Sequence, residues 1–80
     1  MDTKRYLLDS LAEYYRGKVA KHRANLTVLL EKHAGLAEHP DIIETLDNEV
    51  GKLAEYDEKL EMLTKHFYVQ RIEVLPSDYR

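Results

Sequence analysis

The chain contains no cysteine and no tryptophan, and it has only two prolines and three glycines among its 80 residues. Without cysteine there is no disulfide framework and no thiolate metal site, so a reducing compartment is expected. No apolar run approaches the roughly 18 residues of a membrane span, and the first residues lack the apolar core of a signal peptide. These absences predict one small cytoplasmic domain that does not engage a membrane.

The small size of the chain is itself informative. Below about 70–80 residues a single hydrophobic core seldom stabilises a fold by more than a few kcal/mol. Small domains gain further stability from disulfides, metals or oligomerisation. Since cysteine is absent, we expect oligomerisation.

The few glycines and prolines divide the sequence into two long segments and a tail. Gly35 follows a helical pattern, as a glycine C-cap does, and Pro40 precedes acidic residues that suit the first turn of a helix. The pattern predicts helices over about 3–34 and 40–70, joined by a turn at 35–39. A connection of this length is typical of an antiparallel helical hairpin.

Each predicted helix has an apolar stripe with helical spacing, which indicates a buried face. The first stripe contains Leu8, Leu11, Tyr15, Val19, His22, Leu26, Leu29, His33 and Leu36, and the second contains Ile42, Leu46, Val50, Leu53, Tyr56, Leu60, Leu63 and Phe67. Consecutive four-residue steps around Tyr15 predict a stutter, which would locally unwind a left-handed supercoil. The fold class is therefore all-α: a coiled-coil-like hairpin over residues 1–71.

Further apolar residues lie beside both stripes. They are Leu7, Tyr14, Val28 and Leu30 in the first segment and Ile43, Ala54 and Met62 in the second. A two-helix hairpin covers only one narrow seam on each helix, so the surplus predicts a second buried surface. The simplest arrangement is a homodimer that closes into a four-helix bundle.

The C-terminal residues 72–80 form a predicted tail. Residues 68–75 alternate partly with a period of two before Pro76, which favours a short extended segment. The tail could pack along the hairpin, could dock on a partner as a strand or linear peptide, or could be disordered.

Charge is distributed unevenly along the chain. Residues 1–39 hold seven Lys and Arg against five Asp and Glu, whereas residues 40–80 hold five against ten. The basic residues Arg16, Lys18, Lys21 and Arg23 follow Tyr14 and Tyr15, a combination that raises the possibility of nucleic-acid binding. A hairpin folded about residue 38 instead places Lys18 opposite Glu58 and Lys21 opposite Glu55, with Arg16 and Arg23 near Glu61 and Glu55. We favour this intramolecular pairing.

Neither the histidines nor the acids form a pattern typical of catalysis or metal binding. His22 and His33 are eleven residues apart, about 16 Å along a helix, too far to bind one ion. His33, Glu38 and His39 near the turn make only a weak zinc arrangement. No nucleophile motif, glycine-rich phosphate loop or Glu-x-x-His pair is present. We therefore expect no enzyme activity, no cofactor and no metal, with His22 and His33 in or beside the seam, where charging them at pH 5 would destabilise the fold.

The segments 37–46 and 52–63 carry a resemblance to a known group of proteins. With the rest of residues 20–67, they resemble small uncharacterised helical-hairpin proteins of T4-like tailed bacteriophages. The resemblance implies an accessory protein in the bacterial host cytoplasm, near replication or recombination proteins, and it brings no functional residues to transfer.

The expected function is that of a non-enzymatic interaction protein, which self-associates and binds an unidentified partner protein. Aromatic residues concentrate at binding hot spots. The candidate partner contacts are Tyr14, Tyr15, Tyr68, Ile72, Val74 and Tyr79. The alternative is an accessory factor that contacts nucleic acid through Arg16, Lys18, Lys21 and Arg23.

Overall fold

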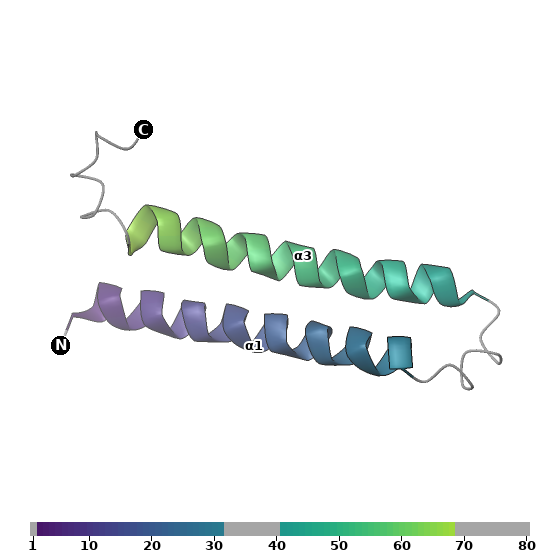
Figure 1. Cartoon of the computed structure of the whole chain (residues 1–80). Coiled ribbons are helices and arrows are strands. Elements are labelled where there is room, and N and C mark those ends of the chain that lie inside the picture. The colour runs from purple at the N-terminus through teal and green to yellow at the C-terminus, as the bar shows by residue number, and fades with distance from the viewer. Residues whose placement is uncertain (1, 32–40, 69–80) are drawn as a thin grey trace, which may run out of the picture.

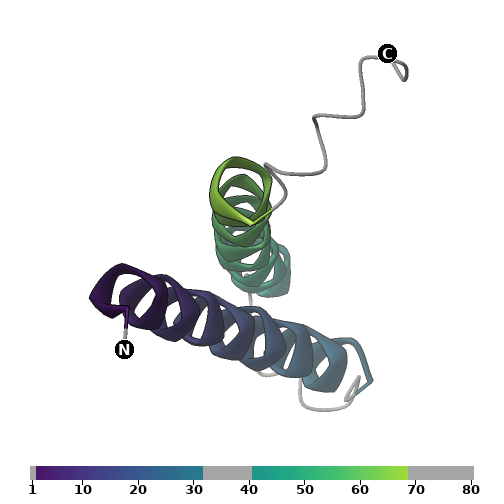
Figure 2. The same ribbon diagram turned by 90° about the vertical axis from the view of Figure 1, so that its left-hand side faces the viewer.

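The computed structural model of the chain describes residues 2–31 and 41–68, which form two long antiparallel helices. Helix α1 spans Thr3–Glu31 and helix α3 spans Ile42–Phe67. The helices run side by side in opposite directions (Figure 1), and they contact each other along their length. The view turned by 90° shows α3 above α1, with the two helices inclined to each other (Figure 2). The described residues contain no strand. The predicted all-α helical hairpin is confirmed.

Helix α3 begins two residues later than the predicted start at residue 40. Asp41 is the N-cap, and its carboxylate accepts a hydrogen bond from the backbone N–H of Glu44 at 3.3 Å. Aspartate caps helices well because its side chain satisfies one of the unpaired N–H groups of the first turn. Glu44 then lies in the first turn, where the helix dipole favours an acid. The first helical residue is therefore Ile42, and the prediction that the helix begins at residue 40 is wrong.

The other predicted boundaries are only partly covered by the described residues. Helix α3 ends at Phe67, and the backbone N–H of Tyr68 bonds to the carbonyl of Thr64 at 3.0 Å as the C-cap contact. The last predicted residues of the first helix (32–34), the turn at 35–39 and the tail at 72–80 lie outside the described residues.

The two helices meet along a seam of residues spaced alternately by four and three. In α1 the seam contains Leu8, Ala12, Tyr15, Val19, His22, Leu26 and Leu29, and in α3 it contains Ile42, Leu46, Glu49, Leu53, Tyr56, Leu60 and Leu63. This unbroken seven-residue repeat is the pattern of a left-handed coiled-coil seam. The predicted stutter around Tyr15 is therefore wrong.

The stutter was predicted because one seam position in α1 was assigned to the wrong residue. Ala12 occupies that position and is 2 % exposed, whereas Leu11 is 38 % exposed. The spacing of the repeat places residue 12 in the seam and residue 11 beside it, so alanine is buried there although leucine is more hydrophobic. In α3 the same error occurs, because Glu49 lies in the seam and Val50 is exposed.

Candidate interaction surface

A polar cluster crosses the middle of the seam. The buried ring of His22 places Nδ1 2.8 Å from Oε1 of Glu49, and Nδ2 of Asn25 donates to the same oxygen at 3.3 Å. Because an ionised carboxylate only accepts hydrogen bonds, Nδ1 of His22 is the donor. The other side of the cluster is aromatic, since the His22 ring stacks on Tyr56 with planes 3° apart. His22 thus lies in the seam as expected, with its polar atom satisfied by the opposite helix.

The contact with His22 changes the acidity of Glu49. The hydrogen bond from His22 lowers the pKa of Glu49 below its ordinary value of 4.5, partly opposed by burial. This carboxylate accepts from Nδ1 whether the ring is neutral or charged, so acidification to pH 5 leaves the contact in place. The reason for expecting a loss of stability at pH 5 is thereby removed for His22.

We expect instead that stability falls at lower pH, as Glu49 is protonated. A group whose pKa is lowered by folding stabilises the fold above its unfolded pKa, and this contribution is lost as the pH falls through the folded pKa. In thermal melts the stabilisation by Glu49 should therefore be fully present from pH 7.5 to 5 and should be lost below about pH 4.5.

The Glu49→Gln variant is the control, since it keeps the shape of the side chain and cannot be protonated. It should be less stable than wild type at pH 7 and should approach wild type at pH 3. If the variant and the wild type differed in melting temperature by the same amount at pH 7 and pH 3, ionised Glu49 would not be the source of the pH dependence.

A tyrosine cluster adjoins the polar cluster toward the chain termini. The rings of Tyr14, Tyr15 and Tyr56 lie 5.9 to 6.4 Å apart between centroids, with Tyr14 edge-on to Tyr56. The ammonium groups of Lys18 and Lys59 lie 5.5 and 4.9 Å from the centroid of Tyr56. Cation–π contacts of this kind contribute about 0.5–1 kcal/mol at exposed sites. Of these rings, Tyr14 is the exposed one and Tyr15 is half-buried in the seam.

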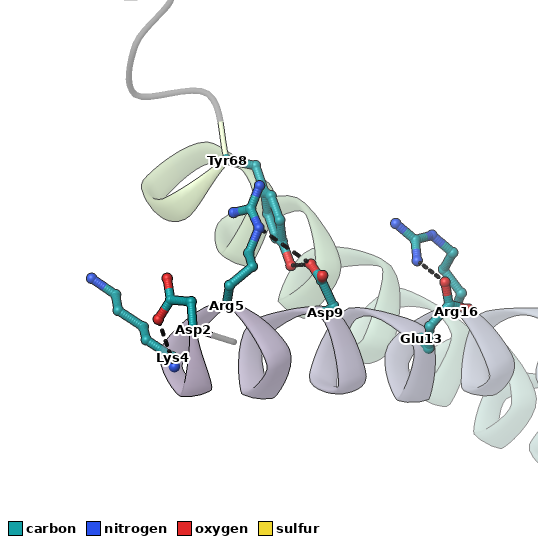
Figure 3. Close-up of polar contacts among 7 residues, drawn as sticks. All are labelled: Asp2, Lys4, Arg5, Asp9, Glu13, Arg16 and Tyr68. Carbon is teal, nitrogen blue, oxygen red and sulfur yellow. Dashed lines mark hydrogen bonds and ion pairs between the residues drawn. The ribbon is translucent and has the colours of Figure 1, made fainter.

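Tyr68 is held in place at the end of the hairpin. Its hydroxyl donates to Oδ1 of Asp9 at 2.7 Å, and the guanidinium of Arg5 lies 4.9 Å from its ring centroid (Figure 3). Partial burial and the bond to Asp9 raise the pKa of Tyr68 above its ordinary value. Tyr68 therefore fastens the end of α3 to α1, which makes it a less suitable partner contact than Tyr14.

The basic residues of α1 do not form the predicted cross-helix ion pairs. Arg16 pairs with Glu13 on its own helix at 2.7 Å, as Figure 3 shows, and Lys59 pairs with Glu55 on the other helix at 3.0 Å. In the two described helices, no Lys or Arg of α1 forms an ion pair with an acid of α3. An acid three or four residues away on the same helix is a nearer partner for these side chains than an acid across the seam.

The four candidate nucleic-acid contacts lie on two sides of α1. At about 3.6 residues per turn, Arg16 and Arg23 share one side, whereas Lys18 and Lys21 share the other. Lys18 is also engaged by the tyrosine cluster, at 5.6 Å from the ring centroid of Tyr14. One phosphate backbone would not reach all four cations, so the helical geometry disfavours a continuous nucleic-acid track.

Exposed apolar side chains are the dominant feature of the surface. Ten large apolar residues are more than a third exposed, whereas only three described residues are buried: Ala12, His22 and Leu63. The exposed residues are Tyr6, Leu7, Leu11, Tyr14, Val28, Leu30, Ile43, Val50, Met62 and Phe67. Single exposed apolar residues are ordinary, but contiguous patches mark interaction sites.

Six of these residues lie at the end of the hairpin that carries the chain termini, and all of them except Tyr6 form one set. We call this set the terminal patch: Leu7, Leu11, Tyr14, Met62 and Phe67. Beside them an open groove of about 420 Å³ is lined by Tyr15, Glu58, Lys59, Met62, Leu63, His66 and Phe67. The patch thus combines apolar side chains of both helices with a groove into which another side chain could fit.

The remaining candidates can be placed only in part. Ile72, Val74 and Tyr79 lie outside the described residues, as do His33, Glu38 and His39. Among residues 2–31 and 41–68, no three His, Asp or Glu side chains are grouped so that they could hold a metal ion. Neither described helix is long and apolar enough to cross a membrane.

Comparison of the chain with models of protein families, with curated proteins and with solved structures gave no match.

Proposed function

We propose that this protein is a non-enzymatic interaction module: a helical hairpin that self-associates and, in that form, binds a partner protein. The observation that carries the proposal is an imbalance within residues 2–31 and 41–68, which have ten exposed large apolar side chains and three buried residues. A hairpin with so small a core gains stability when its outer faces are covered by another chain. A homodimeric four-helix bundle covers them with the fewest components.

The chemistry of the surface supports binding over catalysis. The polar pair of His22 and Glu49 lies within the seam. Its hydrogen bond joins α1 to α3, so the pair serves the contact between the helices. The accessible groove beside the terminal patch is lined mainly by apolar groups and is open to solvent. Such a surface recognises another protein by shape and apolar contact.

The partner protein would contact surface that self-association leaves free. The tail residues Ile72, Val74 and Tyr79 are candidates, together with exposed residues of the hairpin. If the resemblance to phage hairpin proteins reflects common origin, this partner acts in the bacterial cytoplasm. Nucleic acid is the less favoured ligand, since the four basic residues lie on two sides of α1.

The self-association is tested by the mass of the intact chain in solution. Size-exclusion chromatography with light scattering at micromolar concentration is expected to give twice the chain mass of 9.4 kDa. The melting temperature should also rise with protein concentration, because association stabilises only the folded chains. A 9.4 kDa species with a melting temperature independent of concentration would refute the proposal.

A further inference from the structure

The side chains around the terminal patch form two parallel rows on one side of the hairpin. The row on α1 contains Leu7, Leu11, Tyr14 and Lys18, and the row on α3 contains Glu55, Lys59, Met62 and His66. Spacing by three and four residues keeps each row along one side of its helix. Both rows lie on the same side of the seam, because Lys18 and Lys59 both lie over the ring of Tyr56.

The apolar area on this side matches what a stable dimer buries. The five residues of the terminal patch are 38 to 60 % exposed. With ~150–200 Å² for a whole side chain of this size, they present roughly 400 Å² of apolar surface. A standard interface buries ~800 Å² on each partner, of which a little over half is apolar. The terminal patch is therefore large enough to form the apolar centre of such an interface.

The charges that border the patch are complementary under a two-fold axis. The α1 row carries Lys18 and no acid. The α3 row carries Glu55 at the same level of the hairpin, and Lys59, one turn away, pairs with Glu55 at 3.0 Å. A two-fold axis parallel to the helices places α1 of one protomer against α3 of its partner, which brings Lys18 of each toward Glu55 of the other. Surfaces that meet around a two-fold axis must be complementary to themselves, and the placement of Lys18 opposite Glu55 of the partner meets this requirement.

We infer that the terminal patch is the self-association surface and that its occupant is a second copy of this chain, with α1 packed against α3 of the partner. This inference rests on the proposed function and specifies which face carries it. The exposed ring of Tyr14 supplies an aromatic anchor of the kind that is common at the centre of interfaces. The faces with Leu30, Ile43 and Val50 remain available to another protein.

The test compares two matched double variants of the full chain. Leu7→Glu with Met62→Glu places charge in the terminal patch, and Leu30→Glu with Ile43→Glu places the same charge on the other side of the hairpin, at residues that are also more than 40 % exposed. The patch variant should weaken self-association roughly 100-fold or more, as charge in an apolar interface centre does. The control variant should associate as wild type does, and both should keep the circular dichroism of the helices.

A charge exchange tests the orientation of the two copies. Lys18→Glu alone and Glu55→Lys alone should each weaken association, and the double variant should recover much of it. Dimers that survive the patch variant, or that are lost in the control variant, would overturn the assignment of the face and leave self-association intact. A wild-type chain that is monomeric throughout would overturn the proposed function as well.

Discussion

Replacement of Leu63 by alanine is expected to lower the free energy of unfolding by about 2–4 kcal/mol, which is a large part of the stability of so small a fold. Leu63 is the one large aliphatic side chain that the described helices bury, at 8 % exposed. Its removal leaves a cavity in the seam, because two packed helices have few neighbouring side chains that could fill it. The melting temperature should fall by roughly 10–20 °C.

The control for this prediction is Ile43→Ala, which removes a comparable side chain from a position that is 72 % exposed. It should change stability by less than about 0.5 kcal/mol, as surface substitutions usually do. Urea unfolding of the two variants at one protein concentration would give the comparison. If both lost the same free energy, the seam would not be the main source of stability in the hairpin.

Replacement of His22 by alanine is expected to cost about 2–3 kcal/mol, because it leaves the carboxylate of Glu49 in the seam without its main donor. The side chain of Glu49 is 23 % exposed, so water compensates only in part. The stacking of the imidazole on Tyr56 is lost at the same time.

A double-mutant cycle separates the hydrogen bond from the packing. If His22 and Glu49 stabilise each other, His22→Ala together with Glu49→Ala should cost less than the sum of the two single substitutions, by about 1.5–3 kcal/mol. Asn25→Ala, whose bond to Glu49 is longer at 3.3 Å, should show a smaller coupling to Glu49. Strictly additive effects would mean that His22 stabilises the seam by packing alone.

The sequence was sufficient to predict the hairpin, because helical periodicity and the punctuation by Gly35 and Pro40 are properties of each segment by itself. The signal in the sequence for the start of α3 is the capping side chain of Asp41. The adjacent Pro40 also favours a helix start, and it led to a predicted start two residues too early. The seam itself was predicted correctly at most positions. The prediction is wrong at Ala12 and Glu49, because the most hydrophobic residue near each position is not the one that the seam buries.

The signal that would have placed both residues was the regularity of the spacing. A repeat of four and three residues that continues without interruption selects Ala12 over Leu11 and Glu49 over Val50. The partner of Glu49 was also visible in the sequence as the polar seam residue His22. The ion pairs of Arg16 and Lys59 could not be predicted by folding the sequence about residue 38 and matching opposite charges. They depend on which side-chain rotamers reach an acid on the same helix.

The polar pair in the seam also determines how α1 and α3 align along their length. Sliding one helix by a single heptad would bring His22 level with Ile42 or Tyr56 rather than Glu49. The carboxylate and the imidazole would then lose each other as hydrogen-bond partners inside the seam, at a cost of several kcal/mol. The alignment is thus encoded in the helices and does not depend on the length of the segment that joins them. Chains with residues inserted between Glu31 and Asp41 should keep the same pairing, and two separate peptides covering α1 and α3 should find it without any covalent connection.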